Sequence, residues 1–324
     1  MMRRGCLLGI IAAIVLALGS LTWLLGGWYW GGPLEKDASF LVPDGASLKS
    51  VSEKLEREGA VSSASGFYMR ARIFGAGGSI KAGEFSLPAG ASPSRVLSIL
   101  QGGEAVRRFV TVPEGMPSIM VYERVMGQSL LTGSVAVPPE GSILPDTYDF
   151  ERGESRQAVL LRMQTAMQRT LAELWEKRSP DTVAKTPQEA LILASIVEKE
   201  TGKPSERRLV AGLYSNRLRQ GIMLQADPTI IYPITKGKPL GRRIRQSEIQ
   251  AINDYNTYSM VGLPKGPITN PGRESIEAVL NPAKTDALYM VADGTGGHAF
   301  ASTLAEHNAN VEKWYTLRKA RGDF

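Results

Sequence analysis

The sequence predicts an α+β chain in three parts: one N-terminal transmembrane helix, a small βααβ module, and a mixed α+β domain. Three observations predict this division. An uncharged apolar run opens the chain, a strand–helix–helix–strand pattern follows it, and the remainder alternates amphipathic helices with turn-rich loops and a late hairpin. The boundaries that follow are residues 1–4, 5–30, 36–112 and 113–324.

Composition excludes several classes of protein. The chain has 324 residues, and its formal net charge of +6 is too mild to indicate a nucleic-acid partner, because no Lys/Arg run is interleaved with aromatic residues. The single cysteine, Cys6, excludes an intramolecular disulfide. His298 and His307 are the only histidines, and without a His/Cys cluster we predict neither a metal site nor a cofactor.

Residues 5–30 form the predicted transmembrane helix. The range holds no charged side chain, and it exceeds the roughly 20 residues that a bilayer-spanning helix needs. Trp28, Tyr29 and Trp30 close the run in the manner of an interfacial aromatic belt, with Trp23 a little deeper. We predict an uncleaved anchor. A cleaved signal peptide fits less well, because the apolar region is too long and no small-residue cleavage site follows it.

The charges beside this helix predict its orientation. Arg3 and Arg4 lie in the short tail 1–4, and the positive-inside bias places them in the cytoplasm. No second apolar stretch of that length follows in the sequence. The chain is therefore predicted to cross the cytoplasmic membrane once, with its N-terminus inside and the remainder outside.

Residues 36–112 carry the predicted module and a connecting strand. Segments 39–42 and 83–87 have strand character, and two helices lie between them, ended by Gly59 and Gly75. This order resembles LysM, a small fold that holds glycans containing N-acetylglucosamine. A plain spacer domain is the alternative, and the sequence leaves both open.

The domain 113–324 contains several predicted helices and one hairpin. The predicted elements are helices over 119–125, 156–177, 186–202, 205–221 and 303–321, a brief helix opened by Asp227, and a hairpin of strands 288–292 and 298–301. Ser205 is the expected N-cap of the helix that it begins. His298 and His307 are interpreted as hydrogen-bonded structural residues.

The helix at 186–202 organises this domain. Thr186 is a suitable N-cap, Pro187 fits the first turn, and Glu189 completes a capping box, while Gly202 supplies the left-handed residue that commonly ends a helix. The body between these residues is apolar almost all round. The helix is therefore predicted to be buried.

Glu200 continues the apolar face of this helix. The residues three and four positions before it are valine and isoleucine, whereas Glu198 follows a smaller and more polar face. Desolvation and the negative end of the helix dipole both raise the pKa of such a carboxyl group, and a glutamic acid that keeps its proton can act as a general acid. The alternative is a solvated side chain paired with Lys203 or Arg207.

Several separate blocks of the sequence are distinctive. They are PEGMP near 113, LPDTY near 144, ASIVEKETGKPSERRLVAGLYSNRLRQGIMLQADPTIIY from 194, YNTYSMVGLPKGPITNPG from 255, and NPAKTDALYMVADGTGGHAF from 281. Together they resemble the endolytic murein transglycosylases, the YceG-like family. The resemblance implies that 113–324 is a catalytic domain that cleaves peptidoglycan strands between N-acetylmuramic acid and N-acetylglucosamine. The implied product is a 1,6-anhydro sugar, formed without water.

The resemblance also assigns residues to the site. It puts Glu200 at the acid/base position of the family, in agreement with the apolar-face argument, so that one carboxyl group serves both steps. The residues that motif matches place along the glycan groove are Gln225, Asp227, Tyr255, Asn256, Thr257 and Asn270. Asp227 is also the nearest candidate for a second carboxylate, although its position before Pro228 favours a helix N-cap.

Partners and location follow from the same resemblance. Peptidoglycan strands are the expected substrate, the N-terminal helix contacts the inner membrane, and the catalytic domain lies in the periplasm near cell-wall synthesis proteins, where it helps to end new strands. Two alternatives stay open. One is a hydrolytic muramidase in which Asp227 activates water, and the other is a non-catalytic glycan-binding scaffold for wall synthesis.

Overall fold

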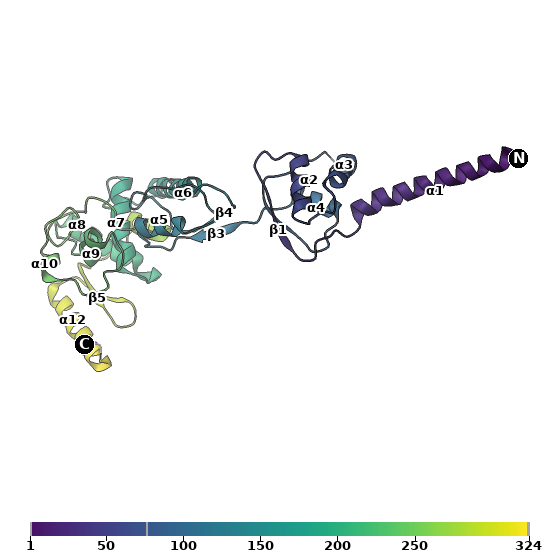
Figure 1. Cartoon of the computed structure of the whole chain (residues 1–324). Helices are drawn as coiled ribbons and strands as arrows, with labels where there is room; N and C mark the ends of the chain where they lie inside the picture. The colour runs from purple at the N-terminus through teal and green to yellow at the C-terminus, as the bar shows by residue number, and fades with distance from the viewer. Residues whose placement is uncertain (1, 76, 323–324) are drawn as a thin grey trace. The chain divides into compact units, whose positions relative to one another are not determined.

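The protein is described by a computed structural model that covers residues 2–75 and 77–322, with side chains from residue 9 onward (Figure 1). The chain divides into two compact units, Met1–Arg108 and Phe109–Phe324. Helices and strands occur in both units, in agreement with the predicted α+β class. The outer ends of the first and last predicted segments, at residues 1 and 323–324, lie outside the described residues.

Helix α1 (Met2–Tyr29) begins the first unit and is drawn in purple in Figure 1. Its segment Gly9–Tyr29 has a mean hydropathy of 2.1 and is, within the described part of the chain, the one helix long and apolar enough to cross a membrane. The predicted orientation depends on Arg3 and Arg4, whose side chains lie outside the described ones.

The end of α1 belongs to the folded module, which corrects the predicted aromatic belt. Trp28 is only 2% exposed. Its ring centroid lies 5.9 Å from that of Phe67 and 6.0 Å from that of Phe74, both on helix α3 (Ala64–Phe74). Trp28 is therefore a core residue of the module, whereas the other two aromatic residues of the predicted belt are exposed.

The rest of the first unit follows the predicted order of strand, helix, helix and strand. Its elements besides α1 and α3 are β1 (Ala38–Val42), α2 (Leu48–Arg57), β2 (Gly83–Leu87) and α4 (Pro93–Gly102). Strands β1 and β2 pair antiparallel, with Phe40 opposite Phe85, and both side chains are buried in the core of the module. The likeness of this module to LysM stays a prediction.

The second unit combines helices with two small sheets. Its elements are β3 (Arg108–Thr111), α5 (Ser118–Met126), β4 (Thr147–Phe150), α6 (Arg156–Glu176), α7 (Pro187–Glu200), a 3-10 helix (Pro204–Glu206), α8 (Arg207–Arg219), α9 (Asp227–Thr235), α10 (Gln246–Ile249), α11 (Arg273–Leu280), β5 (Tyr289–Ala292), β6 (His298–Ala301) and α12 (Leu304–Arg321). Strand β3 pairs with β4, and β5 forms an antiparallel hairpin with β6, as predicted. Each helix predicted for this domain is present, with ends shifted by at most two residues.

The largest core of the second unit surrounds α7. Residues 190–197 of this helix are all buried, as its apolar composition predicts. Helices α6, α8 and α11 pack against it, and Leu193 and Ile196 share one apolar cluster with Val279 of α11. Helix α11 is absent from the sequence prediction, because it spans only 8 residues and begins after Gly272 without a side-chain cap.

At the N-termini of these helices, one predicted cap is confirmed, whereas a predicted capping box and a second predicted cap are wrong. The Thr186 hydroxyl accepts a hydrogen bond from the Glu189 amide (3.1 Å), as an N-cap does. The Glu189 carboxylate accepts from the Lys185 amide (2.6 Å), so it closes no capping box with Thr186. Ser205 lies inside the short 3-10 helix, and Glu206 directly precedes α8. The proline before Ser205 starts that 3-10 turn and displaces the predicted cap.

Candidate active site

Glu200 is the last residue of α7, and the predicted left-handed ending at Gly202 is wrong. Thr201 is extended, with φ −137° and ψ 128°, and Gly202 has no positive φ. The Thr201 hydroxyl accepts a hydrogen bond from the Lys203 amide (3.0 Å). Lys203 is extended as well, since the ring of Pro204 disfavours helical backbone in the residue before it. The helix therefore stops where the chain approaches Pro204.

The Glu200 carboxyl group lies in a cavity of about 360 Å³, here called the Glu200 cavity. Its Oε1 atom is buried and has no hydrogen-bond partner among the described residues. Leu213 and Ile231 contribute apolar walls. Burial and then the negative charge of Asp227 raise the pKa of Glu200 to about 7, against an opposing effect of the Tyr214 hydroxyl. The desolvation predicted from the sequence is confirmed, whereas the sequence does not indicate the contribution of Asp227.

Asp227 lies in the same cavity, and its predicted role as an N-cap is wrong. Ala226 occupies the N-cap position of α9, and Asp227 is the first helical residue. Its exposed carboxylate accepts a hydrogen bond from the Tyr258 hydroxyl (2.7 Å), and burial together with this bond raises the pKa of Tyr258. The Glu200 cavity therefore holds two carboxyl groups in different settings, one buried and one exposed.

Gln225 reaches the cavity through an uncommon backbone conformation. Its φ is +54°, a value that few residues other than glycine adopt. The Gln225 amide donates a hydrogen bond to the Thr257 carbonyl (3.1 Å), and Arg217 Nη1 donates to Gln225 Oε1 (3.1 Å) and to the Leu224 carbonyl (3.1 Å). Backbone strain that neighbours hold in place is common at functional sites.

Tyr214, Arg217 and Tyr258 also line the Glu200 cavity, and the sequence motifs alone do not assign them to it. Tyr214 and Arg217 are three positions apart on α8, so they share one face of that helix. Both are buried, although one carries a phenol and the other a charge. The sequence signal for these two residues is a phenol and a guanidinium on the inward, otherwise apolar face of a helix.

Asn256 and Thr257 support the walls of the cavity instead of lining it. Both are 0% exposed. The Thr257 hydroxyl accepts a hydrogen bond from the Ala226 amide (3.0 Å). The Asn256 side-chain amide donates to the carbonyls of Ile249 (2.9 Å) and Ala251 (2.6 Å). Because neither side chain is accessible, the prediction that they line a glycan groove is corrected for both.

Tyr255 and Asn270 lie outside the lining of the Glu200 cavity. The Tyr255 ring packs against that of Tyr232, with 4.8 Å between centroids. Asn270 is 0% exposed; its Oδ1 accepts from the Ile143 amide (3.0 Å), and its Nδ2 donates to the Met116 carbonyl (2.9 Å). Asn270 therefore joins two loops that are distant in sequence, and its predicted place in the groove is corrected.

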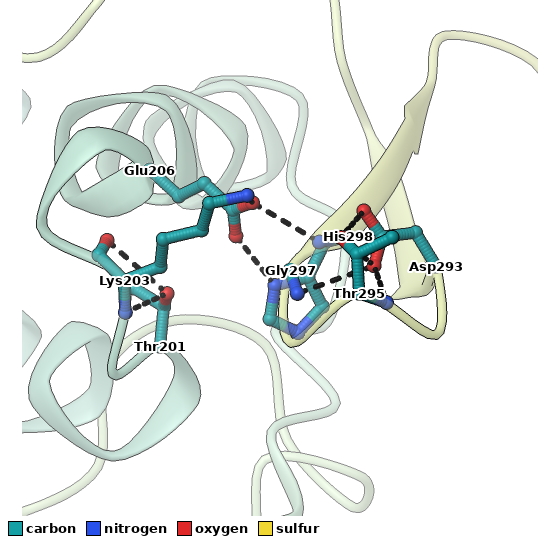
Figure 2. Close-up of polar contacts among 7 residues, drawn as sticks. All are labelled: Thr201, Lys203, Glu206, Asp293, Thr295, Gly297 and His298. Atoms are coloured by element: carbon teal, nitrogen blue, oxygen red, sulfur yellow. Dashed lines mark hydrogen bonds and ion pairs between the residues drawn. The ribbon is translucent and has the colours of Figure 1, made fainter.

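The β5–β6 hairpin is fastened to the segment that follows Glu200, as Figure 2 shows. The Glu206 carboxylate accepts a hydrogen bond from the His298 amide (3.1 Å), lies 2.8 Å from the His298 ring Nδ1, and lies 3.4 Å from the Lys203 ammonium. A Cβ atom at Gly297 would lie 2.2 Å from Glu206 Oε1, so any other residue there would displace the Glu206 carboxylate. Because Met290 of this hairpin lines the Glu200 cavity, the contact also fixes one of its walls.

The two histidines differ in their surroundings. His298 is hydrogen bonded to Glu206, as predicted. The His307 ring stacks on Tyr289 with 5.2 Å between centroids, and its Nδ1 is buried without a hydrogen-bond partner among the described residues, which corrects the prediction for this residue. Burial lowers the pKa of His307. Neither ring lines the Glu200 cavity.

A larger cavity of about 1090 Å³ lies elsewhere in this unit, beside the start of α7 and the end of α8. It contains none of the site residues named above. Of its three acidic residues, Asp286 is exposed, Asp181 lies 3.7 Å from the Lys284 ammonium, and Glu189 accepts a hydrogen bond from the Lys185 amide. None of them is a buried carboxyl group like that of Glu200. We therefore take the Glu200 cavity as the candidate active site despite its smaller volume.

A glutamic acid with a buried carboxyl oxygen and a raised pKa, at the wall of a polar cavity, is typical of an acid/base enzyme site. The chain belongs to the YceG-like family, whose model matches residues 40–313, and the family predicted from the motifs is confirmed. It is similar to an endolytic murein transglycosylase of Bacillus subtilis, with 26% identity over 89% of this chain and 89% of that protein.

Two further comparisons agree with this assignment. An endolytic murein transglycosylase of Streptococcus pneumoniae is 28% identical over 83% of this chain, which spans 57% of the length of that relative. The crystal structure of a YceG-like protein from Listeria monocytogenes matches with a TM-score of 0.54 and 26% identity, over 85% of this chain and 98% of that one. The fold is thus shared with a solved member of the family.

Proposed function

We propose that this chain is a peptidoglycan lytic transglycosylase that cuts within glycan strands, between N-acetylmuramic acid and N-acetylglucosamine. The observation that carries the proposal is Glu200, a buried carboxylic acid with a pKa of about 7 in a cavity large enough to admit a substrate. The names of the relatives in Bacillus subtilis and Streptococcus pneumoniae support the same substrate class.

The proposed reaction uses Glu200 twice. Protonated Glu200 donates its proton to the glycosidic oxygen, and the bond from that oxygen to C1 of N-acetylmuramic acid breaks with oxocarbenium-like character. The C6 hydroxyl of the same sugar then attacks C1, and the Glu200 carboxylate takes the proton that this hydroxyl loses. The products are a new N-acetylglucosamine end and a 1,6-anhydro-N-acetylmuramic acid end. Usual glycosidases need a second carboxyl group for these steps.

The residues around Glu200 have supporting roles in this proposal. The Asp227 carboxylate, oriented by Tyr258, stabilises positive charge that develops at C1 and helps to keep Glu200 protonated. The Gln225 side chain, held by Arg217, offers its amide to sugar hydroxyls. Tyr214 restrains the Glu200 carboxyl group through its hydroxyl.

The proposed location is the outer face of the cytoplasmic membrane. Helix α1 supports a single membrane anchor, since it has the length and hydropathy of a membrane span. With Arg3 and Arg4 inside, the catalytic unit lies in the periplasm, close to newly made strands. There it ends nascent strands beside cell-wall synthesis proteins, while the LysM-like module contacts the glycan.

A hydrolytic muramidase is the second candidate, and the position of Asp227 favours it. This carboxylate is exposed in the same cavity as Glu200, where it could activate a water molecule for attack on C1. The two candidates differ in the source of the oxygen that ends on C1. It comes from the C6 hydroxyl in the first case and from water in the second.

The products of the full-length protein are expected to be anhydro ends. Digestion of uncrosslinked strands in water labelled with heavy oxygen, followed by mass spectrometry, separates the candidates. A transglycosylase incorporates no solvent oxygen, and its products are lighter by one water than hydrolysed ends. Incorporated label that disappears in the Asp227→Asn variant would establish the muramidase instead.

The pH dependence of cleavage is expected to follow the protonation of Glu200. Because the general acid must carry its proton, kcat/KM is level below about pH 7 and falls as the pH rises through that value. In the Asp227→Asn variant one cause of the raised pKa is removed, so the falling limb moves to lower pH. Initial rates over a pH series check both statements, and a profile that stays level well above neutral pH would contradict them.

A further inference from the structure

A second cavity, here called the Met120 cavity, adjoins the Glu200 cavity. It has a volume of about 460 Å³ and shares Lys199, Pro228 and Ile231 with the Glu200 cavity, so the two meet across these residues. The apolar side chains that line it also include Met116, Met120, Leu240 and Ile268. Its volume lies within the range of about 300–1,000 Å³ that small-molecule sites occupy.

Two loops that are fixed against each other form the Met120 cavity. Gly237 lies on one loop with φ +83°, and a Cβ atom there would lie 2.7 Å from the Pro117 Cβ on the other loop. The Pro117 loop is in turn held by Asn270, which donates to the Met116 carbonyl. The cavity is therefore formed before any ligand arrives, which lowers the cost of binding.

Of the charged residues that line the Met120 cavity, one lysine is available to bind an anionic ligand. Lys238 pairs with Glu123, and the Glu114 carboxylate accepts a hydrogen bond from Arg207 (2.7 Å). The third charged residue of the lining, Lys199, is exposed, and it has neither an ion pair nor a hydrogen bond within the part of the chain that the structure describes. An apolar pocket with a free ammonium at its wall suits a ligand that carries both methyl groups and a carboxylate.

We propose that the Met120 cavity binds the peptide stem of N-acetylmuramic acid. The Lys199 ammonium binds a stem carboxylate, and the apolar wall takes the methyl groups of the lactyl ether and the first alanine. This inference rests on the proposed function, because only a muramic acid beside Glu200 presents such a substituent there. Lys199 directly precedes Glu200, so a sugar at the carboxylic acid extends its side group across the shared wall.

The test compares two substrates with the full-length protein in detergent: uncrosslinked strands with their stems, and the same strands after an amidase has removed the stems. The wild type is expected to prefer the stem-bearing strands by kcat/KM. The Lys199→Ala variant lowers this preference about tenfold, which is the effect expected when a hydrogen bond to a charged group is lost. Lys199→Arg, which retains the charge, keeps most of the preference.

A second variant and a matched control keep the test decisive. Leu240→Glu places a negative charge in the apolar wall on an accessible loop, and it is expected to lower the preference for stem-bearing strands by repelling their carboxylates. Lys265→Ala removes another exposed lysine, one that pairs with Asp254 (3.0 Å) and lines neither cavity, and it is expected to leave both rates unchanged.

Three outcomes overturn this inference. A wild type with no preference between the two substrates would show that the stem is not bound. Equal slowing of both substrates by Lys199→Ala would show that Lys199 acts on the chemistry at Glu200 and not on the stem. A wild type that cleaves neither substrate would overturn the proposed function, and the inference with it, so the two failures are distinguishable.

Discussion

The Glu200→Gln variant is expected to lose glycan cleavage by about 10³-fold or more, because the same carboxyl group donates one proton and removes another. Glutamine preserves the size of the side chain and its ability to form hydrogen bonds, but it transfers no proton at neutral pH. Release of fragments from uncrosslinked strands by the full-length protein measures the loss. Strand binding measured in parallel is expected to be retained, since the cavity keeps its shape.

The same substitution is expected to stabilise the protein above neutral pH. The pKa of Glu200 is raised from 4.5 to about 7 in the folded chain, so between these values the folded state binds more protons than the unfolded state. The stability of the wild type therefore falls as the pH rises from about 4.5 to about 7, by up to about 3 kcal/mol. The variant escapes this loss, and thermal melting at acidic and alkaline pH compares the two.

Glu198→Gln is the matched control for both effects. Glu198 lies two residues earlier on the same helix, where its Oε2 accepts a hydrogen bond from the Gly272 amide (2.9 Å) outside the Glu200 cavity. Cleavage is expected to continue within a few-fold of the wild type. If Glu200→Gln cleaved strands at the wild-type rate, the acid/base assignment to Glu200 would fail. A wild type that released no fragments would instead favour the non-catalytic scaffold.

The second large effect is expected from Asn270→Ala, and it concerns stability. This side chain is fully buried and bonded to Ile143, Met116 and the Ser118 hydroxyl (3.1 Å), which come from two other segments of the chain. Alanine leaves the buried Ile143 amide unsatisfied and removes the bonds to Met116 and Ser118, at a cost of about 3 kcal/mol in the free energy of unfolding. For a unit of this size, the loss lowers the melting temperature by roughly 6–12 °C.

Asn308→Ala provides the comparison for this stability effect. Asn308 is exposed on α12, so its removal is expected to change the free energy of unfolding by less than about 0.5 kcal/mol. The melting temperatures of the two full-length variants and the wild type, measured in detergent, test this prediction. An Asn270→Ala protein that melts with the wild type but has a raised KM would return Asn270 to the substrate groove.

The chemistry of α7 could be predicted from its sequence because burial follows the helical period. The apolar face ends at Glu200, so the Glu200 carboxyl group is buried with that face and its pKa is raised by desolvation. The role of Asp227 could not be predicted in the same way. The local pattern predicted that Asp227 caps a helix before Pro228. In the structure its carboxylate instead accepts a hydrogen bond from the hydroxyl of Tyr258, which is distant in sequence.

The groove residues show a second limit of sequence reasoning. Asn256, Thr257 and Asn270 belong to a motif rich in amides and hydroxyls, and such groups bind either sugars or the backbone. All three bond to backbone groups that only the folded chain brings within reach. Gln225 differs because its side chain is exposed and lines the Glu200 cavity.

Trp28 has a practical consequence for any shortened form of the protein. Its indole packs beside Phe67 and Phe74, so cleavage of the chain after α1 would remove a core residue of the module and expose two phenyl rings to water. A fragment released in this way is expected to self-associate. A form that retains the last turns of α1, with polar replacements at its exposed apolar positions, is expected to stay monomeric.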